Sequence, residues 1–416
     1  FVLEAGEYAG PLVAQGKRLT VVGDAAGKTV IAGTEKFAGA VVVADAKADL
    51  TLADVGFRTV NDKQAAVMVR QSSARLVGCR FESLKDYAVY VEGGDVIVSR
   101  GTFTAVASLG VAAFKGSTVR VFESTFSDGK RSALHAQDGS TLAVEACRFG
   151  KLREAAVVGL KGSTVRVHGS RFDAVANAAI AVQGASLAVI RHNAFSACRA
   201  VADCDGTAEL IVSGNTVDGG PEDDGVRLRP AGPTAITDNA FRGVQTAVAV
   251  TGATSAPVAI ARNTAVSMRR GGIYLSGGSE GVTARLYHNR ILGFPKVGLL
   301  LDEEVRAVMV GNAVIADAGE AMAASIQNGA SILASGNILV ADQAAASFYQ
   351  SDAAVSRFDD DLLFGPVLAG DRRPLLGPMT RRLDVLLRED AARAELATAV
   401  EEYRSQPADR RDSALS

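Results

Sequence analysis

Short runs in which apolar and polar residues alternate recur along most of this chain. Residues 163–184 read STVRVHGSRFDAVANAAIAVQG, in which Val165 and Val167 alternate with polar neighbours before a turn. Phe172 follows the turn, and after a polar stretch a second apolar run ends at Gly184. Alternation with a period of two is typical of strands that bury one face. The pattern predicts an all-β chain of short strands, because the helical period of a helical solenoid is missing.

The same unit repeats at a nearly constant interval. One apolar position in each unit keeps its phase with spacings of 22 to 26 residues. Its members are Phe57, Phe81, Phe103, Phe126, Phe149, Phe172, Phe195, Val217, Phe241, Ala265, Ile291, Val314 and Leu339. Periods of this length indicate a stack of similar coils, so we expect like residues to lie on like residues in one continuous core.

An asparagine precedes the repeating apolar position by two residues in the later units. These residues are Asn193, Asn215, Asn239, Asn263, Asn289, Asn312 and Asn337. Asn tolerates the left-handed backbone conformation that a sharp bend between strands needs, and stacked Asn side chains hydrogen-bond to one another. We therefore expect an inward-facing ladder that belongs to the scaffold.

Three phrases carry a family resemblance: DGVRLR at 224–229, GGIYLS at 271–276 and VGLLLD at 297–302. With the opening residues 1–24, they resemble the right-handed parallel β-helix (pectate lyase-like) superfamily of the carbohydrate-associated repeat type. The resemblance implies an all-β solenoid, a single right-handed parallel β-helix of about 14 coils over residues 1–365. It also implies a protein that acts on carbohydrate.

The chain changes character after the predicted solenoid. Residues 366–416 are predicted as a separate part, with an irregular segment, an amphipathic helix at 379–406 and a disordered tail. The helix has Leu383, Leu386, Leu387, Val400 and Tyr403 as its apolar positions. It would either pack on or near the last coil or dock to a partner protein.

Composition narrows the functional classes. The net charge of −2 argues against a nucleic-acid partner, and the longest apolar runs are too short for an integral membrane segment. The chain begins at Phe1 without a leader, as a processed or partial sequence would, and we favour an exported (periplasmic or secreted) protein over a cytoplasmic one.

Cys79 and Cys147 would lie three coils apart, too far for a disulfide. Without HExxH, CxxC or a calcium loop, we expect no metal and no cofactor.

Candidate chemistry lies on the second strand of each coil, where residues nine and eleven after the repeating position point outward. We predict Arg227, Tyr274 and His135 as catalytic residues. The predicted substrate-binding residues are Arg229, Glu222, Asp224 and Asp302. Arg227 and Tyr274 occupy equivalent positions two coils apart, with Ala249 between them. The competing interpretation is that all of these are ordinary solvated side chains.

The resemblance implies a polyuronate lyase or C5-epimerase acting on an acidic polysaccharide. Arg227 would neutralise the sugar carboxylate, and Tyr274 or His135 would remove the C5 proton. The alternative is a non-catalytic β-helix that binds or supports a polysaccharide or a protein partner. The Asp-Pro-His-Asp motif of alginate epimerases does not occur and the chain contains no Trp, which favours the alternative.

Overall fold

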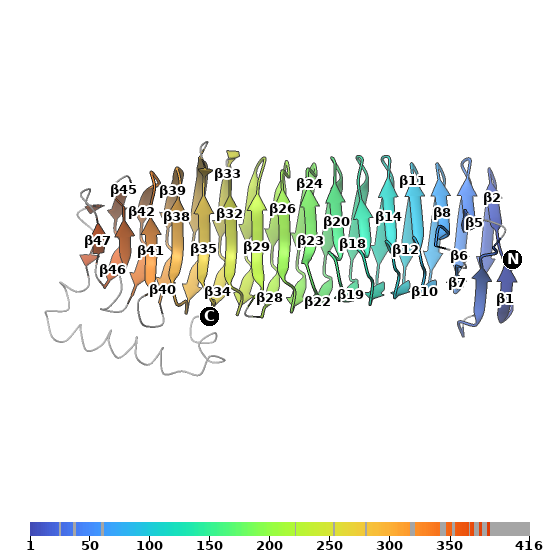
Figure 1. The fold of residues 1–416 in the computed structure, drawn as a ribbon. Coiled ribbons are helices and arrows are strands. Elements are labelled where there is room, and N and C mark those ends of the chain that lie inside the picture. The colour runs from blue at the N-terminus through green and yellow to red at the C-terminus, as the bar shows by residue number, and fades with distance from the viewer. Residues whose placement is uncertain are drawn as a thin grey trace.

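The computed structural model describes residues 1–24, 26–35, 39–59, 62–220, 222–252, 254–278, 281–316, 321–341, 347–351, 354–365, 367–369, 374–376 and 381–382. Its named elements over these ranges are all short β-strands. Each coil contributes one strand to each of three parallel sheets, and the coils stack side by side into a long rod (Figure 1). We name the sheets I, II and III in the order in which a coil visits them.

Sheet I has 17 strands and the other two have 16 each. Sheet I contains β1 (Gly6–Ala9), β4 (Thr29–Ala32), β7 (Gly56–Arg58), β10 (Arg80–Glu82), β13 (Thr102–Thr104), β16 (Thr125–Ser127), β19 (Arg148–Leu152), β22 (Arg171–Val175), β25 (Ala194–Ser196), β28 (Thr216–Asp218), β31 (Ala240–Arg242), β34 (Thr264–Val266), β37 (Arg290–Leu292), β40 (Ala313–Ile315), β43 (Ile338–Val340), β46 (Leu362–Phe364) and β49 (Arg381–Arg382). Sheet II contains β2 (Leu12–Gln15), β5 (Ala40–Asp45), β8 (Ala65–Arg70), β11 (Val89–Glu92), β14 (Val111–Phe114), β17 (Leu134–Ala136), β20 (Val157–Leu160), β23 (Ala178–Gln183), β26 (Ala200–Asp205), β29 (Asp224–Arg229), β32 (Thr246–Thr251), β35 (Gly271–Ser276), β38 (Val297–Asp302), β41 (Met322–Ile326), β44 (Phe348–Gln350) and β47 (Val367–Ala369). Sheet III contains β3 (Arg18–Val22), β6 (Asp49–Ala53), β9 (Ser73–Val77), β12 (Asp95–Ser99), β15 (Thr118–Phe122), β18 (Thr141–Glu145), β21 (Thr164–His168), β24 (Leu187–Arg191), β27 (Leu210–Ser213), β30 (Thr234–Thr237), β33 (Thr254–Ala261), β36 (Val282–Tyr287), β39 (Val305–Val310), β42 (Ser331–Ser335), β45 (Val355–Asp359) and β48 (Leu375–Leu376).

The predicted all-β solenoid is confirmed, but about 14 coils was too few. Sheets of 16 and 17 strands require more. The repeating apolar position continues beyond the phenylalanines, because Tyr8 pairs with Ile31, and Ile31 pairs with Phe57. At the other end Leu339 pairs with Leu363. Coils at both ends thus use different apolar residues at this position, so a count of the regular series misses them.

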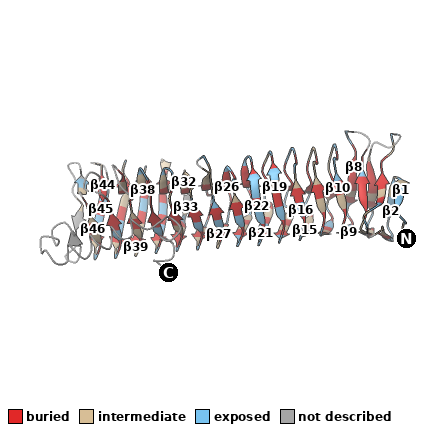
Figure 2. Ribbon diagram, turned by 90° about the horizontal axis from the view of Figure 1, so that it is seen from below, coloured by how far each residue is buried: buried red, intermediate tan, exposed pale blue. Residues whose placement is uncertain are grey.

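The core is a stack of like residues along the rod axis, and buried positions run through its whole length (Figure 2). Phe126 pairs with Phe149 in the next coil, as predicted, with ring centroids 5.1 Å apart. Phe149 and Phe172 are 4.7 Å apart with an interplanar angle of 8°. Aromatic rings are therefore buried face to face in a continuous column within sheet I.

The asparagines form the predicted inward ladder at the turns from sheet III to sheet I. Asn239, for example, donates from its backbone N and its Nδ2 to Asn263 Oδ1, at 3.1 and 2.9 Å. The ladder ends at Asp361, whose Oδ1 accepts two 2.7 Å hydrogen bonds from Asn337. All seven asparagines are buried.

The backbone role predicted for these asparagines was wrong. The left-handed residue is the one immediately before the asparagine, such as His192, Asp238, Arg262 or His288, with φ between 53° and 60°. These residues are exposed. The bend therefore places its left-handed residue in solvent and leaves the asparagine free to face the core and bond along the axis.

The last described strands continue the three sheets. β46 pairs with β49, so Arg381 and Arg382 are strand residues at the start of the predicted helix 379–406. The rest of that helix, and the predicted tail, lie outside the described residues. In the described part of the chain there is no helix long and apolar enough to cross a membrane.

Candidate functional site

The outer face of sheet II presents two columns of outward side chains along the rod. In the first column, paired residues follow one another coil by coil: Met68, Tyr90, Ala112, His135, Val158, Ala181, Asp203, Arg227, Ala249, Tyr274 and Leu300. The second column lies two residues further along each strand and includes Glu92, Phe114, Gln183, Asp205, Arg229, Ser276 and Asp302. All the predicted site residues except Glu222 and Asp224 occupy one of these columns.

Arg227 is held between two carboxylates. Its Nη2 donates to Asp203 Oδ2 at 2.8 Å, from the preceding coil of the first column. Its Nη1 lies 3.8 Å from Asp224 Oδ2, at the start of the same strand. The guanidinium is therefore fixed and largely neutralised by its neighbours, while its buried Nε has no hydrogen-bond partner in the structure.

Asp224 is half-buried where the longer loop enters β29. Burial raises the pKa of its carboxyl group, and the positive charge of Arg227 opposes that rise. Glu222 and Asp224 line a shallow hollow with Arg227 and Arg199. The sequence analysis gave Asp224 as a substrate-binding residue, and it did not identify Asp203, the closest partner of Arg227.

Tyr274 lies two coils from Arg227, with Ala249 between them, as the sequence predicted. At about 4.8 Å per coil the two positions are about 10 Å apart. Arg229 pairs with Asp205 in the second column, three coils from Asp302. Asp302 accepts a 2.7 Å hydrogen bond from Asn328 Nδ2.

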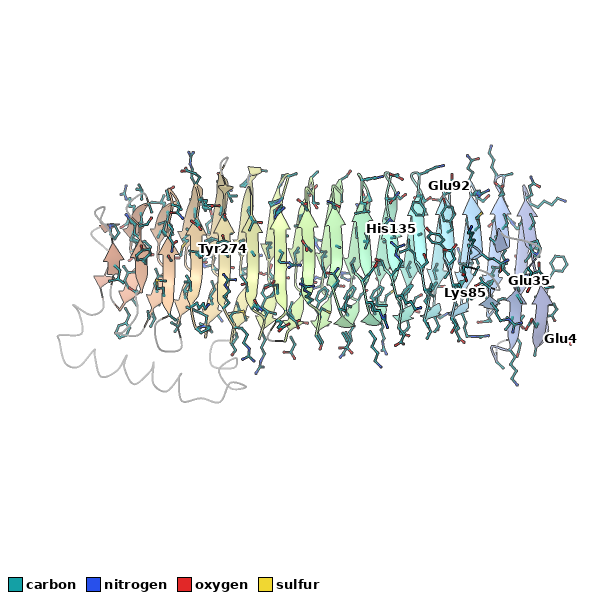
Figure 3. All side chains as sticks on the ribbon, in the orientation of Figure 1. Glu4, Glu35, Lys85, Glu92, His135 and Tyr274 are labelled. Atoms are coloured by element: carbon teal, nitrogen blue, oxygen red, sulfur yellow. The ribbon has the colours of Figure 1, made fainter. Side chains whose placement is uncertain are left out.

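His135 does not join this group. Four coil steps separate it from Arg227, which is about 19 Å along the axis. Figure 3 shows His135 and Tyr274 well apart on the rod. His135 Nε2 and Gln137 Oε1 are 3.0 Å apart, and burial lowers the pKa of the imidazole despite this contact. The structure therefore separates the three predicted catalytic residues into two regions.

His135 belongs instead to a row of aromatic rings on sheet II, which we call the aromatic strip: Tyr87, Tyr90, Phe114 and His135. Neighbouring ring centroids are 5.5, 5.2 and 5.8 Å apart along this row. All four side chains are partly exposed. Sequence spacing gave Tyr90, Phe114 and His135 as outward residues, but they alternate between the two columns, so their contact is visible only in three dimensions.

Polar groups border the aromatic strip. Glu92 accepts a 3.3 Å hydrogen bond from the Tyr90 hydroxyl and pairs with Lys115. The hydrogen bond from Lys115 lowers the pKa of Glu92. Burial, followed by the charge of Glu92, raises the pKa of Tyr90. The strip thus combines apolar ring faces with a charged carboxylate, an ammonium group and the amide of Gln137.

Two family models match overlapping parts of the chain. One is described as a right-handed β-helix region and matches residues 40–195. The other is described as a periplasmic copper-binding protein, NosD, and matches residues 160–353. No curated protein shows significant sequence similarity to the chain.

Solved structures with similar folds are distant. A double mutant of the periplasmic alginate epimerase AlgG is 12% identical, with 89% of this chain and 79% of that chain covered and a TM-score of 0.40. Tailspike protein 3 of bacteriophage CBA120 is 10% identical, with coverages of 91% and 56% and a TM-score of 0.36. The catalytic unit of an alpha-1,3-glucanase from Streptomyces thermodiastaticus is 14% identical, with coverages of 91% and 63% and a TM-score of 0.31.

The copper named by the second family model can be compared with the donors present. Copper sites in proteins use clustered imidazole and sulfur ligands. The described residues contain no group of three or more His, Cys, Asp or Glu side chains that could hold a metal ion. The four cysteines are separate, free and buried, and burial raises the pKa of Cys147 and Cys198 to about 11. The donors in this part of the chain therefore do not fit copper.

Three observations define the class of protein. The strands form three parallel sheets with coil-to-coil register, and like residues stack in the core. The two family matches together extend from residue 40 to residue 353. The chain therefore has the fold of a right-handed parallel β-helix.

Proposed function

We propose that the protein binds a polysaccharide along the outer face of sheet II, with the aromatic strip as the main contact. The observation that carries this proposal is the group of four partly exposed rings, of which Tyr90, Phe114 and His135 come from three successive coils and so follow the rod axis. A linear polymer lying along the rod would meet these rings in succession.

The chemistry of the aromatic strip suits sugar rings. A pyranose has apolar C–H faces and a rim of hydroxyl groups, so it needs a flat apolar surface with hydrogen-bonding groups beside it. Rings supply large contact areas at little entropic cost, and binding sites typically combine them with a few placed polar groups. Here Phe114 supplies an apolar surface, and Glu92 and Gln137 supply acceptors and donors at its edge.

The binding test replaces rings of the aromatic strip. Tyr90→Ala and Phe114→Ala should each weaken retention on immobilised polysaccharide about tenfold, which corresponds to about 1.4 kcal/mol. Alginate, polygalacturonate and a neutral glucan should be compared by affinity electrophoresis, because Lys115 and Arg70 flank the strip and share Glu92 as their acidic partner. The comparison shows whether the strip prefers an acidic or a neutral polymer. Tyr287→Ala, on the outer face of sheet III, is the matched control. Unchanged retention of both strip variants on every polymer would contradict the proposal.

A second candidate function is the lyase or C5-epimerase reaction on a polyuronate. The observation that favours it is the shared column of Arg227 and Tyr274, with only the small Ala249 between them. Arg227 would offset the sugar carboxylate charge while Tyr274, as its phenolate, takes the C5 proton. In a lyase the C4–O bond then breaks and the departing oxygen takes up a proton from the Tyr274 hydroxyl or from water. In an epimerase a water on the other face reprotonates C5 and the Tyr274 hydroxyl gives its proton back to solvent. Of the two predicted bases only Tyr274 is near, and the substrate must compete with Asp203 for Arg227.

Activity is tested separately from binding. A lyase raises ultraviolet absorbance as the unsaturated product forms, and an epimerase changes the NMR spectrum of the polymer without cleaving it. Tyr274→Phe and Arg227→Ala should abolish either activity, whereas Arg285→Ala on sheet III should not. If the wild-type protein binds a polyuronate and leaves it chemically unchanged, the binding function stands and the enzymatic one falls.

We also propose that the protein is exported, to the periplasm or outside the cell. The periplasmic description of the family model over residues 160–353 supports this location, as does a polysaccharide ligand. Cell fractionation with the natural gene tests it: the protein should appear outside the cytoplasmic fraction, and exclusive recovery with a cytoplasmic marker would contradict export.

A further inference from the structure

The outer face of sheet I changes character along the rod. The residue after each repeating apolar position points outward, and from β10 to β31 it is polar or small: Glu82, Thr104, Ser127, Gly150, Asp173, Ser196, Asp218 and Arg242. From β34 onward it becomes Val266, Leu292, Ile315, Val340 and Phe364. We call these five residues the apolar stripe.

The apolar stripe is shielded although its positions point away from the core. Val266, Leu292 and Val340 are only 8%, 3% and 7% exposed. Asp173 and Asp218, in the same column, are exposed. Apolar side chains in register on an outer sheet face are typical of a surface that another element covers.

A groove lies at the N-terminal end of the apolar stripe. It has a volume of about 670 Å³ and is lined by Val266 and Leu292 of the stripe. Its charged lining residues are Arg171, Arg242, Arg290 and Asp218. The groove therefore places three guanidinium groups and one carboxylate next to an apolar surface.

The chain beyond β49 has the complementary composition. β49 is itself the last strand of sheet I, and 416 − 382 = 34 residues follow it. Residues 383–406 contain six acidic residues and three arginines, and Leu383, Leu386 and Leu387 come first. This segment therefore begins at the edge of the face that carries the apolar stripe.

The length of the segment fits the distance. A helix of 24 residues is about 36 Å long. Four coil steps separate β49 from β37, which carries Leu292, or about 19 Å. A helix running back along the rod would cover the apolar stripe with its first turns and bring its acidic end to the arginines of the groove.

We propose that residues 383–406 fold back as an amphipathic helix on the apolar stripe, so that the protein covers the outer face of its own sheet I. The covalent connection to β49 favours this segment over a second copy of the chain, because a segment joined to β49 is present at a high effective concentration near the stripe. Ion pairs with the groove arginines would fix the direction of the helix, since they place its acidic end away from β49.

Cross-linking tests the proposal in the full chain. Ile315→Cys combined with Leu387→Cys should give an intramolecular product with a short bismaleimide, because the apolar face of the helix, which carries Leu387, would lie over Ile315 of the stripe. The native thiols should not interfere, since all four are buried and burial raises their pKa values. The matched control combines Glu82→Cys with Leu387→Cys. Glu82 also lies in sheet I, but ten coils away from Ile315, which is about 48 Å.

The outcomes separate the possible occupants. A monomeric cross-link for the Ile315 pair and none for the Glu82 pair supports the proposal. A cross-link between two chains would show that a second copy covers the stripe, and equal yields for both pairs would show that the segment has no fixed site. Either result would overturn the proposal.

A proteolysis measurement needs no new thiol. Leu386→Asp combined with Leu387→Asp should speed tryptic cleavage after Arg388 at least tenfold, because the helix would lose its apolar contact with the stripe. An unchanged cleavage rate would also overturn the proposal.

Discussion

Asn263 illustrates how much one side chain of the ladder does. Its Nδ2 donates to Ile236 O at 2.8 Å and to Asn289 Oδ1 at 3.0 Å. Its Oδ1 accepts from both the backbone N and the Nδ2 of Asn239. The residue is 4% exposed, so water cannot replace these partners if the side chain is removed.

Asn263→Ala should lower the free energy of unfolding by about 2–4 kcal/mol, because two donors of Asn239 and an acceptor of Asn289 lose their partner in the core. This exceeds the cost of an exposed asparagine. Asn328→Ala, which removes one exposed hydrogen bond to Asp302 and puts alanine at a left-handed position with φ 48°, should lower stability by no more than about 1 kcal/mol. Denaturant melts measure both, and equal small effects would contradict a structural role for the ladder.

Asp361 places a carboxyl group at the end of the ladder. It is 2% exposed, and burial raises its pKa above the usual value of 3.8, although hydrogen bonds from Asn337 oppose the rise. The folded protein therefore holds the proton more tightly than the unfolded chain does. The stability that this group contributes is complete below about pH 4 and is lost as the pH rises through its raised pKa.

Comparison with Asp361→Asn isolates this effect. The unfolding free energy of the wild type, minus that of the variant, should fall as the pH rises from about 4 toward neutrality, since only the wild type has this carboxyl to ionise. Melts at a series of pH values give the difference. A difference that rises with pH over this range would mean that the fold favours the ionised carboxylate.

At the scale of one element, the phenylalanine column makes each short strand of sheet I depend on its neighbours. β19 has a ring contact on each side, with Phe126 at 5.1 Å and Phe172 at 4.7 Å from Phe149. Strands this short have little stability of their own, so the stacked rings supply much of the contact between coils.

Phe149→Ala should open a cavity between two coils and lower the free energy of unfolding by about 3–5 kcal/mol. Phe149→Leu keeps most of the volume and should cost less than the alanine variant, by roughly half or more. Thermal or denaturant melts give both values. Equal losses for the two variants would show that the volume of the ring is not what matters at this position.

The parts of the whole molecule differ in how well the sequence predicts them. Period and alternation reveal the coils, because each strand repeats the same inward and outward pattern, and they also place Arg227 and Tyr274 two coils apart correctly. The contacts of Arg227 could not be predicted, since the nearest carboxylate, Asp203, lies 24 residues away and its rotamer depends on the packing of both strands. The aromatic strip could not be predicted either, because its rings alternate between two columns and contact one another only through the tilt of their side chains.

The direction of the asparagine ladder has a consequence for how such a molecule lengthens. From Asn193 to Asn312 each Nδ2 donates one hydrogen bond to the Oδ1 of the next member and another to a backbone carbonyl of the preceding coil. Each Oδ1 accepts from the member before it, so every internal member must be both donor and acceptor along the series. A duplicated repeat carries its own Asn and fits anywhere inside the series. A carboxylate such as Asp361 only accepts when ionised, so it can stand at the last place but not within the series. Gene duplication can therefore extend this rod from within by whole coils. The Asn of each new coil is aligned by its hydrogen bonds to the Asn of the preceding coil.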